Sequence, residues 1–181
     1  NVCECLIKFN GPKKVGESIH TELFNFLILD KNDVCFTIET SIEIDYIINN
    51  FGITPLPPYI EDLPSKHNDY ISDFSKGGFS VAASTAGLHF DNNMFNKLKK
   101  FGILIKFINL DIGLGTFKPI NTEYIDDYVI HSENYSMIKK EYEDLLDLKN
   151  KGYSVVAVGT TVLRVLETIA ITGNYEGTTN L

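Results

Sequence analysis

The proline cluster at residues 55–58, which reads Pro-Leu-Pro-Pro, constrains the fold of this chain more than any other feature. Proline lacks a backbone N–H donor and has a restricted φ, so neither a helix nor a central strand can run through the cluster. The cluster therefore predicts a rigid, extended connector. We place a domain boundary here and expect two partial domains, residues 1–54 and residues 55–181.

The residues before the connector have the pattern of short antiparallel strands. Apolar, β-branched and aromatic runs cover residues 3–9, 23–29 and 34–40. A polar stretch, residues 30–33, separates the last two runs and predicts a hairpin. Ser41 is expected to cap a short helix that ends at Gly52. We expect residues 1–54 to form a small antiparallel β-barrel-like domain.

Beyond the connector, the sequence alternates between helical and strand patterns. Helical periodicity covers residues 91–101, 136–149 and 162–172, and apolar runs cover residues 103–112 and 153–158. Asp91 is the expected N-cap of the first helix, and Thr160 or Thr161 that of the last. The apolar runs have the continuous hydrophobicity of strands covered on both faces. This order predicts a layered α/β main domain, and residues 177–181 present no closing element.

Composition and charge narrow the class of protein. Hydrophobic residues make up 44% and charged residues 22% of the chain, as in globular proteins, and no apolar run approaches the ~20 residues of a membrane span. Three cysteines without a C-x-x-C pair indicate neither a disulfide framework nor a zinc site, so we expect reduced thiols and a cytoplasmic location. A net charge of −8 argues against nucleic-acid binding by bulk attraction, although Lys97, Lys99, Lys100 and Lys106 are clustered.

Two segments combine small residues with positions suited to ligand binding. Residues 80–90 are mostly small and lead to His89, so a ligand could approach the backbone closely; tight packing with a hydrogen-bonded histidine is the alternative. Residues 111–119 follow a predicted strand and contain Gly113 and Gly115, which can bring backbone N–H groups near an anion. No third glycine opens a helix, so this is not the dinucleotide-binding fingerprint.

Two further segments carry groups suited to proton transfer and anion binding. His131 and Glu133 would point the same way in an extended chain, as an acid/base pair or as a surface pair at a strand edge. In residues 158–167, a buried strand would lead into a hydroxyl-capped helix, whose N-terminus attracts anions. Arg164 could hold a carboxylate there, or could pair with Glu167 on the helix surface.

Taken in order, these segments resemble a known family, the S-adenosylmethionine:tRNA ribosyltransferase-isomerases of queuosine biosynthesis. The family patterns are E-C-L-x-K, P-L-P-P-Y-I, V-A-A-P-T-A-G-L-H-F, H-V-G-x-G-T-F-x-P, H-S-E and V-G-T-T-x-x-R-x-L-E. They are matched by residues 4–8, 55–60, 81–90, 111–119, 131–133 and 158–167. Order and spacing are kept across nearly the whole chain.

The resemblance implies a reaction and its participants. Family members transfer the ribosyl group of S-adenosylmethionine to 7-aminomethyl-7-deazaguanine at the tRNA wobble position and isomerise it, which gives epoxyqueuosine. S-adenosylmethionine is a co-substrate, tRNA is the partner, and neither a metal nor a permanently bound cofactor takes part. We expect a cytoplasmic monomer without membrane contact.

The resemblance also implies roles for individual residues. Catalytic functions, acid/base chemistry and a position near the ribose, are expected for His131, Glu133 and His89. Contacts to S-adenosylmethionine are expected for Thr85, Gly87, Gly113, Gly115, Thr116, Phe117, Thr160, Thr161 and Arg164. Contacts to tRNA are expected for Tyr59, Lys97, Lys99, Lys100 and Lys118.

Several positions depart from the family patterns. Ser84 stands where the family has proline, Asp111 and Tyr128 where it has histidine, and residues 70–74 read Y-I-S-D-F instead of Y-Q-T-V-Y. Residues 61–62 are acidic where an arginine usually follows. These changes favour a second reading, a non-catalytic or decayed family member that keeps the fold and tRNA binding. A third reading, an ordinary methyltransferase, would need a glycine-rich turn opening a helix, which the sequence lacks.

Overall fold

The computed structural model describes residues 1–32, 35–56, 60–61, 68–76, 80–113, 116, 122–127 and 130–181. These residues fall into two compact units. Unit 1 consists of the described residues in 1–53 together with Thr116, and unit 2 of the described residues in 54–113 and 122–181. The predicted division into domains after residue 54 stays a prediction, because a domain is defined by its ability to fold alone rather than by compactness.

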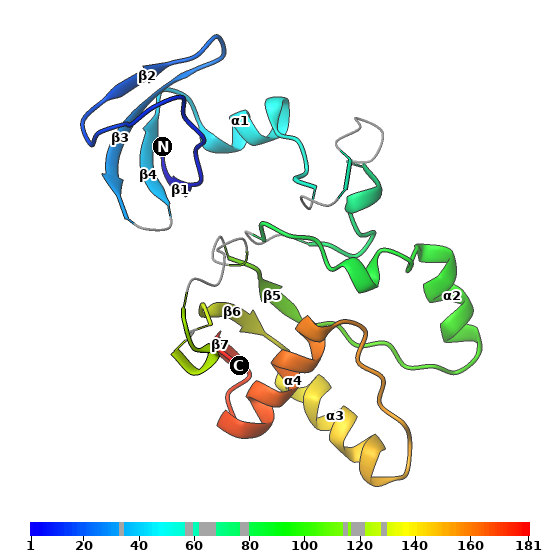
Figure 1. Cartoon of the computed structure of the whole chain (residues 1–181). Coiled ribbons are helices and arrows are strands. Elements are labelled where there is room, and N and C mark those ends of the chain that lie inside the picture. Colours follow the sequence, from blue (N-terminus) through cyan, green and yellow to red (C-terminus); the bar gives the residue numbers. More distant parts are fainter. Residues whose placement is uncertain are drawn as a thin grey trace. The chain divides into compact units, whose positions relative to one another are not determined.

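Unit 1 contains a four-stranded antiparallel sheet (Figure 1). Its strands are β1 (Val2–Cys5), β2 (Ser18–His20), β3 (Asn25–Lys31) and β4 (Phe36–Thr40), in the order β1-β4-β3-β2. β3 and β4 pair as the predicted hairpin, with Ile28 opposite Ile38 and a register shift between Ile28 and Asp30. Among the described residues β1 and β2 are the edges of this sheet, so the barrel-like form stays a prediction.

Alternation along these strands places one set of side chains in the core of unit 1. Phe26, Ile28 and Ile38 are buried. Partly buried residues pack around them: Cys3, Cys5, Ile7, Phe9, Ile19, Phe24 and Phe36. Cys3 and Cys5 share a face, as their spacing predicts, and together with Cys35 they carry free thiols. Burial raises the pKa of Cys3 and raises that of Cys5 to about 12.

The helix of unit 1 ends as predicted but begins differently. α1 (Ile44–Phe51) is followed by Gly52, whose N–H donates to Ile48 O. Its N-cap is Glu43 rather than Ser41. The hydroxyl of Ser41 instead accepts a hydrogen bond from Asn25 N at 3.0 Å. The Ser41 hydroxyl therefore binds the backbone at the start of β3 instead of the start of α1.

Unit 2 combines helices with a small antiparallel sheet (Figure 1). The helices are α2 (Asn92–Lys100), α3 (Lys139–Asn150) and α4 (Thr160–Thr172), with 3-10 turns η2 (Asn68–Tyr70), η3 (Thr85–Gly87) and η5 (Ile125–Asp127). The strands are β5 (Asn109–Asp111), β6 (Glu133–Ser136) and β7 (Glu176–Thr179), in the order β5-β6-β7. The expected mixture of helix and sheet is confirmed.

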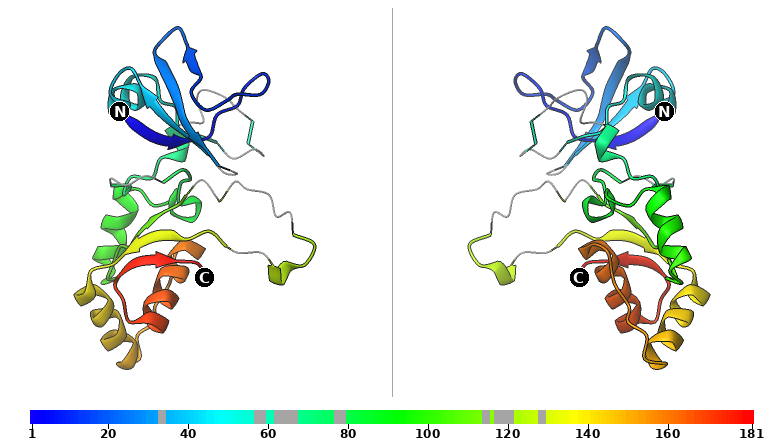
Figure 2. Two further views of the ribbon diagram at one scale, coloured as in Figure 1. Left: turned by 90° about the vertical axis from the view of Figure 1, so that its left-hand side faces the viewer. Right: turned by 90° about the vertical axis from the view of Figure 1, so that its right-hand side faces the viewer.

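One face of this sheet packs against α3 and α4, which lie beside β6 and β7 in Figure 2. Tyr135 of β6 is buried with Tyr142 of α3 and with Val165 and Ile169 of α4. A second apolar group surrounds α2, where the rings of Phe74, Phe90, Phe95 and Phe107 lie 5.7–5.8 Å from their neighbours. The first group packs α3 and α4 onto the sheet, and the second packs α2 against Phe74 and Phe107.

Two predictions about strands in unit 2 are wrong. Of the apolar run 103–112 only β5 is a strand, and residues 153–158 form none. Leu104 is 66% and Val156 80% exposed. A strand needs a neighbour for its backbone groups, and no described strand pairs with the rest of these runs. Conversely, β7 pairs with β6 where no closing element was expected.

The helix starts in unit 2 follow the prediction in one case of three. Asp91 caps α2 as expected, and its Oδ1 accepts from Met94 N at 2.6 Å. The predicted start of the second helix at residue 136 is wrong, because Ser136 belongs to β6 and α3 begins at Lys139. α4 begins after Gly159, and no side chain caps it, so the predicted threonine cap is wrong. No helix in the described part of the chain is both long and apolar enough to cross a membrane.

Candidate functional site

Two of the segments with unusual composition are joined by hydrogen bonds in unit 2, between residues 80–81 of the first and Ile112 of the second. Val81 N donates to Ile112 O at 2.9 Å, and Ile112 N donates to Ser80 Oγ at 3.1 Å. These bonds continue beyond the end of β5 and satisfy backbone groups there. The chain directly after β5 is therefore held at Ile112.

The first of these segments also packs against the start of α4. A Cβ atom added to Gly159 would lie 3.5 Å from Ala86 Cβ and 3.9 Å from Ser84 Oγ, so the two stretches lie close enough for one added carbon to bring them into contact. Gly159 has φ +97°, a conformation that L side chains rarely adopt, and it turns the chain into the helix. Thr85 and Thr160 are exposed beside this contact.

The first turn of α4 presents backbone donors. The N–H groups of Thr160, Thr161 and Val162 precede the first hydrogen bond of the helix, in which Leu163 N donates to Gly159 O at 3.3 Å. Such donors, together with the helix dipole, favour an anion. Contacts of Thr160 and Thr161 with an anionic group stay a prediction.

A buried ion pair joins the last two segments. The guanidinium of Arg164 donates from Nη1 to Glu133 Oε2, and the two side chains are 17% and 6% exposed. Its Nη2 donates to the carbonyl oxygens of His131 and Thr179, each at 3.2 Å. Gly113 N donates to Glu133 Oε1 at 3.4 Å. Arg164 therefore binds Glu133 rather than pairing with its helix neighbour Glu167.

Sequence reasoning missed two threonines that belong to this arrangement. Thr179, opposite Glu133 in the β6–β7 ladder, is 2% exposed, and Thr168 is 3% exposed. Their hydroxyl oxygens lie 2.6 Å apart, and Thr168 Oγ1 donates to Arg164 O at 2.8 Å. Periodicity could not identify Thr179, because the four-residue strand β7 is too short to show a pattern.

His131 lies half-buried just before β6. Its carbonyl oxygen is held by Arg164, whereas its ring atom Nε2 is buried and has no hydrogen-bond partner among the residues that the structure describes. Buried polar atoms almost always have a partner. His131 Nε2 is an exception to this rule in the described part of the chain.

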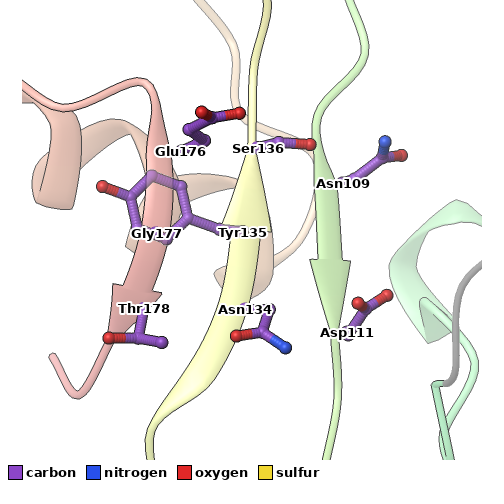
Figure 3. Close-up of a pocket in the computed structure, with 8 residues that line it drawn as sticks. All are labelled: Asn109, Asp111, Asn134, Tyr135, Ser136, Glu176, Gly177 and Thr178. Atoms are coloured by element: carbon purple, nitrogen blue, oxygen red, sulfur yellow. The ribbon is translucent and has the colours of Figure 1, made fainter.

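The face of the sheet turned away from α3 and α4 is polar and hollowed (Figure 3). Two rows of side chains cross its strands: Asn109, Ser136 and Glu176 in one, and Asp111, Asn134 and Thr178 in the other. The hollow has a volume of about 580 Å³. A polar outer face is usual for an antiparallel sheet that covers a core on one side. In the described ranges, no three His, Cys, Asp or Glu side chains are grouped to hold a metal ion.

The other predicted site residues are dispersed. His89 is exposed, and Gly87 is buried where a Cβ atom would collide with the ring of Phe74. Lys97, Lys99 and Lys100 are exposed in the last turn of α2, whereas Lys106 lies 3.5 Å from Glu141 and 3.4 Å from Asp144 of α3. Thr116 is exposed and belongs to unit 1. Gly115, Phe117, Tyr59 and Lys118 lie outside the described residues.

Several departures from the family patterns have local structural roles. Ser84 has φ −72°, within the range that proline adopts, so serine can follow the same backbone path. Ser72 is buried with its Oγ 2.9 Å from Ser75 Oγ, and Asp73 Oδ2 accepts from Asn92 N at 3.3 Å. Asp111 lies at the end of β5 opposite Asn134. Tyr128 and Asp62 lie outside the described residues.

Comparisons with known proteins agree with this set of motifs. A family model described as queuosine biosynthesis protein matches residues 1–181. A protein of Sulfurihydrogenibium sp. (strain YO3AOP1) named S-adenosylmethionine:tRNA ribosyltransferase-isomerase is 39% identical over 185 residues, which cover 100% of this chain and 55% of the relative. Proteins with the same name from two strains of Staphylococcus epidermidis are 44% identical over 122 residues, which cover 67% of this chain and 36% of each relative. The chain thus spans about half the length of these relatives or less, and it belongs to the queuosine biosynthesis protein family.

Proposed function

We propose that this protein acts as an S-adenosylmethionine:tRNA ribosyltransferase-isomerase. It transfers the ribosyl group of S-adenosylmethionine to 7-aminomethyl-7-deazaguanine at the tRNA wobble position and isomerises it to give epoxyqueuosine-tRNA. The observation that carries the proposal is that parts of four family motifs, far apart in the sequence, meet in unit 2. They are joined by the bonds from Val81 to Ile112 and from Gly113 to Glu133, and by the Arg164–Glu133 pair.

The reaction requires proton transfer, and His131 is our candidate for it. A base must remove a proton next to the positively charged sulfur, and an acid must help adenine to leave. The buried Nε2 of His131, without a hydrogen-bond partner in the described part of the chain, supports this role. Histidine side chains exchange protons near neutral pH. His89, exposed after η3, is assigned to the ribose.

The remaining assignments concern binding. The N–H groups of Thr160 and Thr161 bind the methionine carboxylate through the start of α4. Other contacts to S-adenosylmethionine come from Thr85, Gly87, Gly113, Gly115, Thr116 and Phe117. Contacts to tRNA come from Tyr59 and from four lysines, Lys97, Lys99, Lys100 and Lys118. The ammonium groups of the lysines bind phosphates. The protein works in the cytoplasm as a monomer, without a resident metal or cofactor, and residues 1–54 form the barrel-like domain.

The test is single-turnover release of adenine. The intact natural protein is mixed with S-adenosylmethionine and tRNA that carries 7-aminomethyl-7-deazaguanine, and adenine is quantified by chromatography. Release should require both substrates and should be absent with the same tRNA carrying guanine at the wobble position. Release that is independent of the tRNA would contradict the proposal.

The alternative function is that of a non-catalytic family member that binds tRNA. Asp111 favours it, because this position holds histidine in the family pattern and the carboxylate adds negative charge at the end of β5. Under this alternative, tRNA binds in a filter or gel-shift assay while no adenine is released. Restored release in the Asp111→His variant would identify this one position as the cause.

A further inference from the structure

Arg164 is the only arginine among the 181 residues, and the other 15 of the 16 lysines and arginines are lysine. All basic positions except this one carry lysine, and only Arg164 carries a guanidinium. Arginine differs from lysine in presenting several N–H groups in a rigid, planar fork. The position of Arg164 should therefore need more than a positive charge.

The two terminal nitrogens of Arg164 are already used within the protein, whereas its Nε is buried and has no hydrogen-bond partner in the described part of the chain. Nη1 binds the Glu133 carboxylate, and Nη2 is shared between two carbonyl oxygens, those of His131 and Thr179. A substrate carboxylate would need two parallel donors of this fork. Any such pair includes a terminal nitrogen, so the substrate would have to displace either Glu133, whose side chain is only 6% exposed, or the carbonyl oxygens of His131 and Thr179. This geometry argues against the predicted role of Arg164 as a clamp for the methionine carboxylate.

The same contacts place Arg164 at the junction of four segments. It binds the start of β6 through Glu133 and the end of β7 through Thr179, while Glu133 receives the N–H of Gly113 at the start of the loop after β5. The bond to the His131 carbonyl fixes the backbone on which the half-buried imidazole is mounted. A lysine ammonium could replace the charge but not this planar set of bonds.

We infer that Arg164 and Glu133 are positioning residues that fix His131 and the loop at Gly113, and that neither contacts the substrate. For its catalytic part this inference rests on the proposed function. The methionine carboxylate is then bound elsewhere, and the start of α4 is the nearest group of donors on the same helix.

The test compares two variants, Arg164→Lys and Glu133→Gln, with the control Glu143→Gln, whose side chain is 55% exposed on α3. Each intact protein is assayed with S-adenosylmethionine and with decarboxylated S-adenosylmethionine, which lacks the group that a clamp would hold. Both test variants should lower kcat by about 100-fold with little change in the KM for S-adenosylmethionine, because a small displacement of a catalytic group is enough for such a loss. The ratio of kcat/KM between the two substrates should stay at the wild-type value.

Direct binding of the methionine carboxylate by Arg164 would give a different result. If Arg164 binds the carboxylate, Arg164→Lys raises the KM for S-adenosylmethionine and brings the two substrates close to equal kcat/KM. That outcome would overturn the inference while leaving the proposed function intact. If instead the unaltered protein releases no adenine, the proposed function fails.

A readout without turnover separates these cases. The NMR signals of the His131 ring, assigned with His131→Gln, should shift in Arg164→Lys and in Glu133→Gln and stay unchanged in Glu143→Gln. Unchanged ring signals in both test variants would show that the pair does not position His131. Glu133→Gln keeps the test valid where Arg164→Lys fails to fold.

Discussion

Arg164 and Glu133, 31 residues apart in the sequence, form an ion pair in the interior of unit 2. The pair joins α4 to β6, and Glu133 is itself opposite Thr179 of β7. The two charges bind each other, and Glu133 and the terminal nitrogens of Arg164 also bind neighbouring backbone groups, as buried charges require. The Nε of Arg164 is buried without a partner among the described residues.

Loss of one partner should therefore destabilise the protein strongly. Glu133→Ala leaves the guanidinium without its carboxylate, and we expect the free energy of unfolding to fall by about 3–5 kcal/mol. Urea denaturation followed by circular dichroism measures this. In the control Glu143→Ala, which removes an exposed pair with Lys139, the change should stay below about 1 kcal/mol. Equal effects of the two variants would contradict the assigned burial.

Gly87→Ala should be destabilising because of packing. The new Cβ atom would collide with Cζ of Phe74 and lie 3.1 Å from its Cε1. The Phe74 ring cannot simply turn away, because its centroid lies 5.7 Å from the rings of Phe95 and Phe107. We expect the free energy of unfolding, measured by thermal denaturation, to fall by about 1–3 kcal/mol. Gly113→Ala is the matched control, since no atom lies within 4 Å of its added Cβ.

Asp91→Ala should weaken the start of α2. The carboxylate accepts the N–H of Met94, one of the donors without a partner inside the helix. We expect the free energy of unfolding, measured by urea denaturation, to fall by about 0.5–2 kcal/mol. Asp91→Asn keeps a side-chain oxygen and should lose much less. If both variants lose the same amount, the charge of Asp91 rather than its hydrogen bond is responsible.

The Cys5 thiol should make stability fall at high pH. Burial is the main cause that raises its pKa to about 12 in the folded chain, against 9.0 for an ordinary thiol, and the nearby Cys3 adds to it. Between these values the unfolded chain loses a proton that the folded chain keeps, so the free energy of unfolding decreases as pH rises. Cys5→Ala should remove this part of the slope. Below pH 9 alkylation of Cys5 should be slower in the folded than in the unfolded protein, because less thiolate is present.

His131→Ala tests the proposed proton transfer. If His131 is the base, the single-turnover rate of adenine release should fall by about 10²–10⁴-fold. The variant should still bind S-adenosylmethionine, as measured by calorimetry, and should unfold at nearly the same temperature. A smaller loss accompanied by a raised KM would assign the ring to binding instead.

Local signals in the sequence identified elements that depend on neighbouring residues. The β3–β4 hairpin, the Asp91 cap and the end of α1 at Gly52 follow from side chains within a few positions of one another. The apolar runs 103–112 and 153–158 led to wrong strand predictions. Hydrophobicity indicates that a segment favours burial, but it does not indicate which strand is available to pair with it. The four-residue strand β7 carries too little pattern to be recognised at all.

By itself, the sequence determined the family of this protein, because the order and spacing of its motifs can be read without knowing which residues are in contact. It also determined the mixture of helix and sheet and the residues worth testing. Only the tertiary structure decided that Arg164 faces Glu133 and two carbonyl oxygens rather than the solvent or its helix neighbour. The physical reason is that the partners of a buried charge come from segments distant in the chain, and their meeting depends on how β6, β7 and α4 pack together.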